Sequence, residues 1–151
     1  MFKLKLIFFL ILLGFAALFL HNAWLYSPLG GYDAGIQTSY TKILIFEKRI
    51  PTSADTLESY NPPTFYFITG KIAQLFTPLF KGDFLEALKV WQIIIALLLP
   101  LVGYFWLDIF STLNPKNKWS SLLFLVWLLS VPVINKLAPM YSMEPLMLII
   151  G

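Results

Sequence analysis

Residues 90–107 have the sequence VWQIIIALLLPLVGYFWL, in which Gln92 is the one strongly polar side chain and no residue is charged. About 20 consecutive apolar residues are needed to cross the hydrocarbon core of a bilayer. The stretch therefore predicts a membrane-spanning helix over about residues 88–109. Pro100 removes one backbone hydrogen bond, but neighbouring helices can compensate for that loss within a membrane. We expect the helix to continue through it.

A similar apolar run covers residues 6–20, with Lys3 and Lys5 before it and Trp24 and Tyr26 after it. Its front end also resembles a secretory signal peptide, so a cleaved leader is an alternative. No clear small-x-small cleavage site follows, and aromatic residues at the end of the run suit a helix anchored at the membrane interface. We favour an uncleaved membrane helix over about residues 5–25, with the N-terminus in the cytoplasm.

A third run predicts a membrane helix over about residues 119–137, and a fourth begins near residue 144 and reaches the last residue, Gly151. The short turn at 114–118 carries Lys116 and Lys118. Counting crossings from a cytoplasmic N-terminus puts this turn in the cytoplasm, where the positive-inside rule favours lysines. Because so few residues of the fourth run are present, we expect the chain to be truncated.

The composition agrees with a membrane protein, since 58% of the 151 residues are hydrophobic and 13% are charged. A soluble domain has roughly 25% charged residues. The net charge of +3 comes from scattered lysines that form no stripe, so no nucleic acid partner is expected. No cysteine is present, which excludes disulfides, thiolate metal sites and cysteine nucleophiles. The expected fold class is an all-α integral membrane protein, a multi-helix transmembrane bundle.

The segment 26–87 is predicted to form an outer loop with two amphipathic juxtamembrane helices. In the first, Ile36, Tyr40, Ile43 and Leu44 share one helical face. The second follows Pro63, and its shared face consists of Phe65, Ile68, Ile72, Leu75, Phe76 and Leu79. Helices of this kind lie in the interface plane with the apolar face buried. Alternatively Pro63–Phe80 crosses the membrane, but Lys71 at its centre would cost about 2.5–3.5 kcal/mol.

Two acidic residues are candidates for chemistry. Asp33 follows the first apolar run, where a carboxylate can take a proton from an attacking hydroxyl or help to hold a divalent cation. The simpler local interpretation is a helix N-cap. Glu144 precedes the fourth apolar run, and it is either functional or an interfacial residue at a helix start. Glu58 and Asp55 are expected to lie in a solvated loop.

The order of short motifs along the chain resembles a known family. These motifs are Gly31-Tyr-Asp-Ala34, Lys48-Arg-Ile-Pro51, Tyr60-Asn-Pro-Pro-Thr-Phe-Tyr66 and Ala138-Pro-Met-Tyr-Ser-Met-Glu-Pro145. With the apolar runs around them, they resemble the N-terminal part of GT-C superfamily membrane glycosyltransferases. The most similar branch contains protein O-mannosyltransferases and aminoarabinose transferases, and it includes glycosyltransferase family 39.

The resemblance implies an enzyme that transfers a sugar from a polyprenyl-phosphate donor to a hydroxyl acceptor, with inversion at the sugar carbon. The acceptor is a protein, a lipid or a glycan. Asp33 is then the catalytic acid of the first outer loop, and Glu144 is a possible second acid. The resemblance also implies a substrate loop, for which the candidates are Tyr32, Tyr60, Asn61, Pro62 and Pro63. The cofactor stays open; a divalent metal, if any, would be held by Asp33 and Glu144.

The implied location is a multi-pass membrane position, in the plasma membrane of a bacterium or archaeon or in the endoplasmic reticulum of a eukaryote. Membrane lipid is then a partner, and transfer takes place at the extracytoplasmic face. The alternative function is a non-enzymatic accessory or scaffold subunit, or a transporter fragment, whose interfacial helices contact a partner protein.

Overall fold

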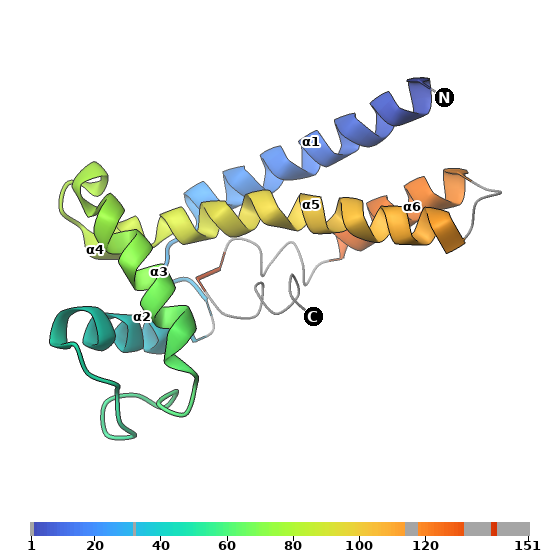
Figure 1. Ribbon diagram of the computed structural model, residues 1–151. Coiled ribbons are helices and arrows are strands. Elements are labelled where there is room, and N and C mark those ends of the chain that lie inside the picture. The colour runs from blue at the N-terminus through green and yellow to red at the C-terminus, as the bar shows by residue number, and fades with distance from the viewer. Residues whose placement is uncertain (1, 32, 114–117, 132–139, 142–151) are drawn as a thin grey trace.

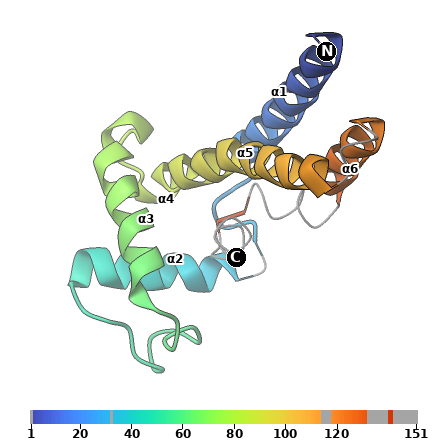
Figure 2. The same cartoon turned by 45° about the vertical axis from the view of Figure 1, so that its right-hand side comes forward.

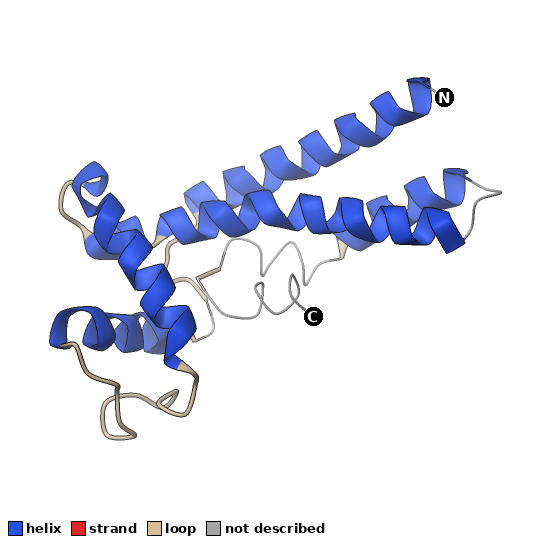
Figure 3. Ribbon diagram, in the orientation of Figure 1, coloured by secondary structure: helices blue, strands red, loops and turns tan. Residues whose placement is uncertain are grey.

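The computed structural model describes residues 2–31, 33–113, 118–131 and 140–141, and the described residues form helices and loops without a strand (Figures 1 and 3). The prediction of an all-α fold is confirmed at this level. The elements, in chain order, are α1 (Phe2–Leu25), α2 (Ala34–Lys42), the π turn η1 (Ile43–Glu47), α3 (Pro63–Phe76), the 3-10 turn η2 (Thr77–Phe80), α4 (Phe84–Ala87), α5 (Lys89–Leu113) and α6 (Lys118–Ser130).

The two longest helices, α1 and α5, pack along each other, and α6 packs beside α5 (Figure 1). α5 continues through Pro100 as expected. By length and composition, Leu6–Leu25 and Phe84–Trp106 could each cross a membrane, a property that signal sequences and buried core helices share. α6 ends at Ser130, before the expected boundary at residue 137, and residues 132–137 and 144–151 lie outside the described residues.

The helices of the segment 26–87 gather at the end of the α1–α5 pair that is remote from the N-terminus (Figure 2). α3 packs on α2, on η1 and on α5, and so connects the loop helices to the long pair. Pro63 is the first residue of α3. At this position a backbone N–H would have no acceptor within the helix, so proline, which lacks the N–H, is tolerated. The chain leaves η1 at Lys48, whose left-handed backbone (φ 56°) ends the helix.

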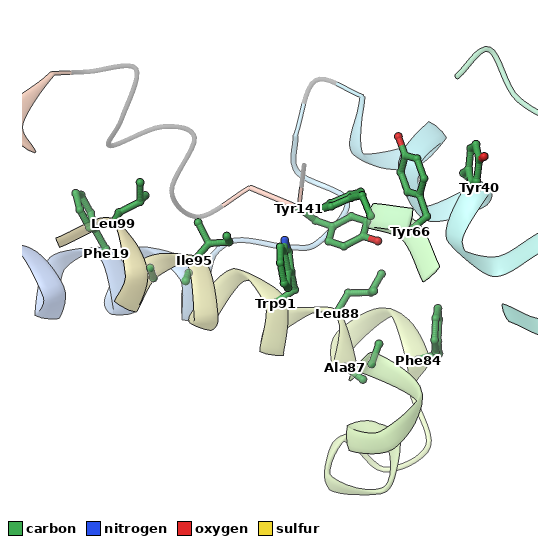
Figure 4. Close-up of a cluster of buried hydrophobic side chains, with 14 of the residues drawn as sticks. Phe19, Tyr40, Tyr66, Phe84, Ala87, Leu88, Trp91, Ile95, Leu99 and Tyr141 are labelled. Atoms are coloured by element: carbon green, nitrogen blue, oxygen red, sulfur yellow. The ribbon is translucent and has the colours of Figure 1, made fainter. Parts of the chain in front are cut away.

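The core follows α5 and then turns toward the loop helices. Figure 4 shows Phe19 of α1 with Ile95 and Leu99 of α5, then Trp91 and the tyrosines that come from three separate segments. Phe65 joins the aromatic side chains, since its ring centroid lies 5.7 Å from that of Trp91 and 5.8 Å from that of Tyr141. Tyr40 and Tyr66 stack at 4.1 Å. The loop helices are thus joined to α5 through aromatic contacts.

The buried face of α2 differs from the apolar face that the sequence predicts. The structure buries Gln37, Thr38 and Thr41 together with Tyr40, while Ile36, Ile43 and Leu44 are only partly covered. The cause is the packing of α2 against α3 and Tyr141, in which the Tyr141 hydroxyl pairs with Thr41. The protein interior thus covers a polar face of α2, and the predicted insertion of its apolar residues into the membrane interface stays a prediction.

The predicted face of α3 is divided between two environments. Phe65 is buried in the core, whereas Ile68, Leu75 and Leu79 are exposed, the last two at 75% and 76%. The inward face is made by Tyr66, Thr69, Gly70 and Ala73 with Phe65. Small and polar residues let α3 approach α2 closely, which leaves the aliphatic residues on the outside.

Candidate functional site

Asp33 takes the N-cap position of α2, as one interpretation of the sequence predicts, but its side chain makes no capping hydrogen bond. Its backbone carbonyl accepts the hydrogen bond from Gln37 N at 2.9 Å. The side chain is partly exposed, and no hydrogen bond or ion pair joins its carboxylate to another described residue. Within the part of the chain that the structure describes, the carboxylate is thus unpaired and partly accessible to a ligand.

Asp83 shows what a capping aspartate looks like in the same chain. Its Oδ1 accepts hydrogen bonds from Leu85 N at 2.8 Å and from Glu86 N at 3.1 Å, at the start of α4. The backbone of Asp83 is extended (φ −82°, ψ 107°), whereas Asp33 has φ −108° and ψ 12°. That backbone difference explains why one carboxylate reaches the helix N–H groups and the other does not.

Tyr141, one of the two described residues of the Ala138–Pro145 motif, contacts the two loop helices. Its ring is fully buried, and its hydroxyl lies 2.7 Å from Thr41 Oγ1 of α2 and 2.8 Å from Thr69 Oγ1 of α3. Each threonine also hydrogen-bonds the backbone carbonyl four residues earlier. Because each threonine hydroxyl has one proton and donates it to that carbonyl, Tyr141 can donate its own proton to only one of the two threonines at a time. Burial raises the pKa of Tyr141 to about 12, so the hydroxyl stays neutral.

Met140 packs against the turn that precedes Asp33. A Cβ added at Gly31 would lie 3.7 Å from Met140 Cβ and 3.2 Å from Ala34 Cβ. Together with the Tyr141 contacts, this places residues 140–141 beside the start and the middle of α2. Met140 and Tyr141 therefore lie against the segment that carries Asp33. Glu144 and Tyr32 themselves lie outside the described residues.

The substrate-loop candidates occupy different environments. Tyr60 is 81% exposed and Pro62 is exposed, whereas Pro63 is the first residue of α3. Asn61 is held in the structure: its backbone carbonyl accepts from Tyr40 Oη at 3.1 Å, and its Nδ2 donates to Tyr66 Oη at 3.0 Å. Of these candidates, Tyr60 and Pro62 are free to meet a substrate.

Glu58 is buried, so the expectation that it lies in a solvated loop was wrong. It is 9% exposed, and its Oε2 accepts from Tyr66 Oη at 2.8 Å and from Asn61 Nδ2 at 3.1 Å. Burial, and then the bond to Glu58, raise the pKa of Tyr66 well above its usual range. The sequence holds no periodic signal for this contact, because Glu58 lies in a loop without repeating structure. Its role is to tie the loop to α3.

Asp55 lies in the same loop and is exposed as expected, but it is paired. Arg49 donates to both of its carboxylate oxygens, at 2.7 and 2.8 Å, and Thr52 donates to it as well. The Arg49 hydrogen bonds come first among the causes that hold the pKa of Asp55 well below its usual range. This arrangement orders residues 49–55 and leaves no free carboxylate there.

We expect Glu58→Ala to destabilise the protein by about 1–3 kcal/mol, because it leaves the buried Tyr66 hydroxyl without its acceptor. For a chain of this size the melting temperature should fall by roughly 2–4 °C per kcal/mol, measured in detergent micelles. Glu58→Gln keeps an acceptor oxygen and should cost less. Glu86→Ala is the control, since its pair with Lys89 is partly exposed and contributes little. Equal melting temperatures for Glu58→Ala and the control would contradict the prediction.

No group of three or more histidine or acidic side chains that could hold a metal ion occurs among the described residues. Asp33 therefore has no described companion ligand, and the predicted partner Glu144 is outside the described residues. Comparisons of the chain with protein-family models, with curated proteins and with solved structures find no match.

Proposed function

We propose that the chain supplies the first membrane helices and the acid-bearing outer loop of a GT-C-type glycosyltransferase that uses a polyprenyl-phosphate sugar donor. The observation that carries the proposal is the free carboxylate of Asp33. It occupies a capping position, makes no cap, and lies eight residues beyond the end of α1. An acid that stabilised only its helix would be expected to bond the helix N–H groups, as Asp83 does.

The surfaces of the long helices support a membrane position for the proposed enzyme. Only 11% of the apolar window in α1 is buried, and large apolar side chains such as Phe9, Leu13 and Trp24 are exposed. A helix in the core of a soluble protein would bury most of them. Lipid around α1 and the outer side of α5 would cover these surfaces.

The outer side of α3 supports an interfacial position for the loop helices. The exposed Leu75 and Leu79 lie between Lys71 and Lys81 in the sequence, and both lysines are exposed. Aliphatic side chains can enter the boundary between headgroups and acyl chains while lysines extend to the phosphates. In this position α2 and Asp33 lie at the membrane surface, where a lipid-linked sugar would be presented.

The chemistry is a single displacement at the sugar. The Asp33 carboxylate takes the proton of the acceptor hydroxyl, while that oxygen forms a bond to C1 of the sugar. The bond from C1 to the phosphate oxygen breaks, and the electron pair leaves with polyprenyl phosphate. Because the oxygen attacks opposite the leaving group, the configuration at C1 is inverted. If a divalent cation takes part, Asp33 is the described residue that could bind it, and the cation would neutralise the leaving phosphate.

The test is a turnover assay. Membranes from cells that express the protein at full length are given polyprenyl-phosphate hexoses and hydroxyl acceptors, and released polyprenyl phosphate is measured. We expect release to depend on both the protein and an acceptor. A chain that acts as an accessory subunit would give no release above membranes without it, and that result would overturn the proposal.

A further inference from the structure

Two lysines end helices with the left-handed backbone that usually belongs to glycine. Lys48 follows η1 with φ 56° and ψ 33°, and Lys81 follows η2 with φ 56° and ψ 29°. Within the described ranges of the chain, they are the only residues other than glycine with a positive φ. A residue with a Cβ is destabilised in this conformation, whereas glycine is not. The folding of these two turns would therefore favour glycine at both positions.

Helix electrostatics do not require a lysine at either position. A cation near a helix C-terminus is favourable, but any position in the last turn serves, with an ordinary right-handed backbone. Both lysines are exposed, and the side chain of neither forms an ion pair or a hydrogen bond with another described residue. Their charges are therefore accessible to a partner outside the chain.

The two helix ends meet at one corner of the loop helices. The ring centroid of Phe46 in η1 lies 4.9 Å from that of Phe84 in α4, edge to face. Lys48 comes two residues after Phe46, and Lys81 comes three residues before Phe84. The turn η2 packs on α4, which leads into α5 (Figures 1 and 2). Two lysines from distant parts of the sequence thus belong to the same corner.

Large apolar side chains are exposed at this corner as well. Leu79 of η2 is 76% exposed and Phe46 of η1 is 56% exposed. The segment Phe84–Trp106, which is long and apolar enough to cross a membrane, begins here. In the proposed membrane position, the corner therefore lies where the chain enters the bilayer.

The acidic side chains near the corner are already engaged. Asp83 accepts hydrogen bonds from two backbone N–H groups at the start of α4. Glu86 pairs with Lys89 at 2.9 Å, and Glu47 pairs with Arg49 at 2.8 Å. The positive charges of the two left-handed lysines thus remain without a described counter-ion. The complementary surface is apolar and carries negative charge, as a bilayer with anionic phospholipid does.

We infer that this corner binds anionic phospholipid of the bilayer, with Lys48 and Lys81 as the residues that contact the headgroup phosphates. The inference rests on the membrane position in the proposed function, but not on sugar transfer. Leu79 and Phe46 enter the boundary between headgroups and acyl chains, and the ammonium groups stay at the level of the phosphates. A zwitterionic phospholipid has the same acyl chains but no net charge, so it binds more weakly.

The experiment measures lipid binding to the full-length protein in detergent micelles, through the rise in melting temperature that a ligand produces. One probe is dioleoyl phosphatidylglycerol, which is anionic, and the other is dioleoyl phosphatidylcholine, which is zwitterionic and has the same acyl chains. No polyprenyl phosphate is present, so the phosphate of a sugar donor cannot be the ligand. Wild type should bind phosphatidylglycerol more tightly at low salt, and added salt should reduce the difference.

We expect the double variant Lys48→Gly/Lys81→Gly to bind phosphatidylglycerol about 25-fold more weakly, from about fivefold for each lysine near a lipid surface. Its affinity for phosphatidylcholine should stay close to wild type. Without lipid its melting temperature should stay equal or rise, because glycine adopts the left-handed backbone readily. Lys48→Arg/Lys81→Arg is the matched control: it keeps both charges and should keep the preference for phosphatidylglycerol.

Three results would overturn the inference: no preference for phosphatidylglycerol in wild type, an unchanged preference in the glycine variant, or an equal loss in the arginine control. A lower melting temperature of the glycine variant with unchanged lipid preference would assign both lysines to the helix ends alone. Turnover separates this inference from the proposed function. If the protein releases no polyprenyl phosphate but the glycine variant loses its preference, only the transferase proposal is wrong, and the reverse result removes only the lipid site.

Discussion

Asp33→Asn is expected to lower the rate of sugar transfer by about 10²- to 10⁴-fold, the range that a general base contributes. Asparagine has the shape of aspartate but cannot take the proton of the acceptor hydroxyl. The fold should not change, because the Asp33 side chain makes no capping hydrogen bond and asparagine is also accepted at helix N-caps. The measurement is release of polyprenyl phosphate at saturating acceptor, together with the melting temperature in detergent.

Asp83→Asn is the matched control for this prediction. Asp83 is also an N-cap aspartate, but it bonds Leu85 N and Glu86 N and lies away from α2. An asparagine there can still accept both bonds, so turnover and stability should stay close to wild type. Transfer at the wild-type rate by Asp33→Asn would remove Asp33 from the mechanism, whereas a similar loss in both variants would indicate a general effect on the helices.

The parts of the fold that depend on local sequence were predicted correctly. The apolar run 90–107 became the centre of α5, and Pro63 opened α3 where a proline is tolerated at the first position. Asp33 was placed at the start of α2 from its position before an apolar pattern. Each of these depends on residues within about one or two turns. Helix propensity and capping act over that distance, so these features can be predicted from the sequence alone.

The polar interior of the candidate site could not be predicted in this way. Tyr141 contacts Thr69 and Thr41 across separations of 72 and 100 residues. Whether a threonine or glutamine is buried depends on such a distant partner, and an isolated helix with this composition would expose them. The error at Glu58 has a different cause. Its partners Tyr66 of α3 and Asn61 of the preceding loop are only eight and three residues away, but the loop has no periodic pattern that would predict these contacts.

The contact between α2 and α3 that holds this interior together has no space for a side chain at Gly70. A Cβ added there would clash with Ile45 Cγ1 of η1 and would lie 2.8 Å from Thr41 Cγ2. Both atoms belong to branched side chains close to their backbones, so neither can turn away. The wider π turn at Ile43–Glu47 faces this point and carries Ile45 to α3.

Gly70→Ala is therefore expected to destabilise the protein by about 1–3 kcal/mol, the usual cost of overpacking a close contact. A substitution in an uncrowded helical position has the opposite effect, since alanine stabilises a helix relative to glycine by about 0.5–1 kcal/mol. Gly35→Ala provides that comparison, because nothing lies within 4 Å of a Cβ added there in α2. Melting temperatures in detergent should fall for the first variant and rise slightly for the second.

The functional consequence follows from the neighbours of Gly70. Thr69 precedes it and bonds Tyr141, which in turn bonds Thr41 on the helix that begins after Asp33. If α3 moves away from α2 to make room for the alanine, this chain of hydroxyl contacts is strained and α2 loses its position relative to α5. At temperatures where Gly70→Ala is still folded, its rate of sugar transfer should then decrease by more than the loss of folded protein explains. Normal turnover by folded Gly70→Ala would show that the position of Asp33 does not depend on this contact.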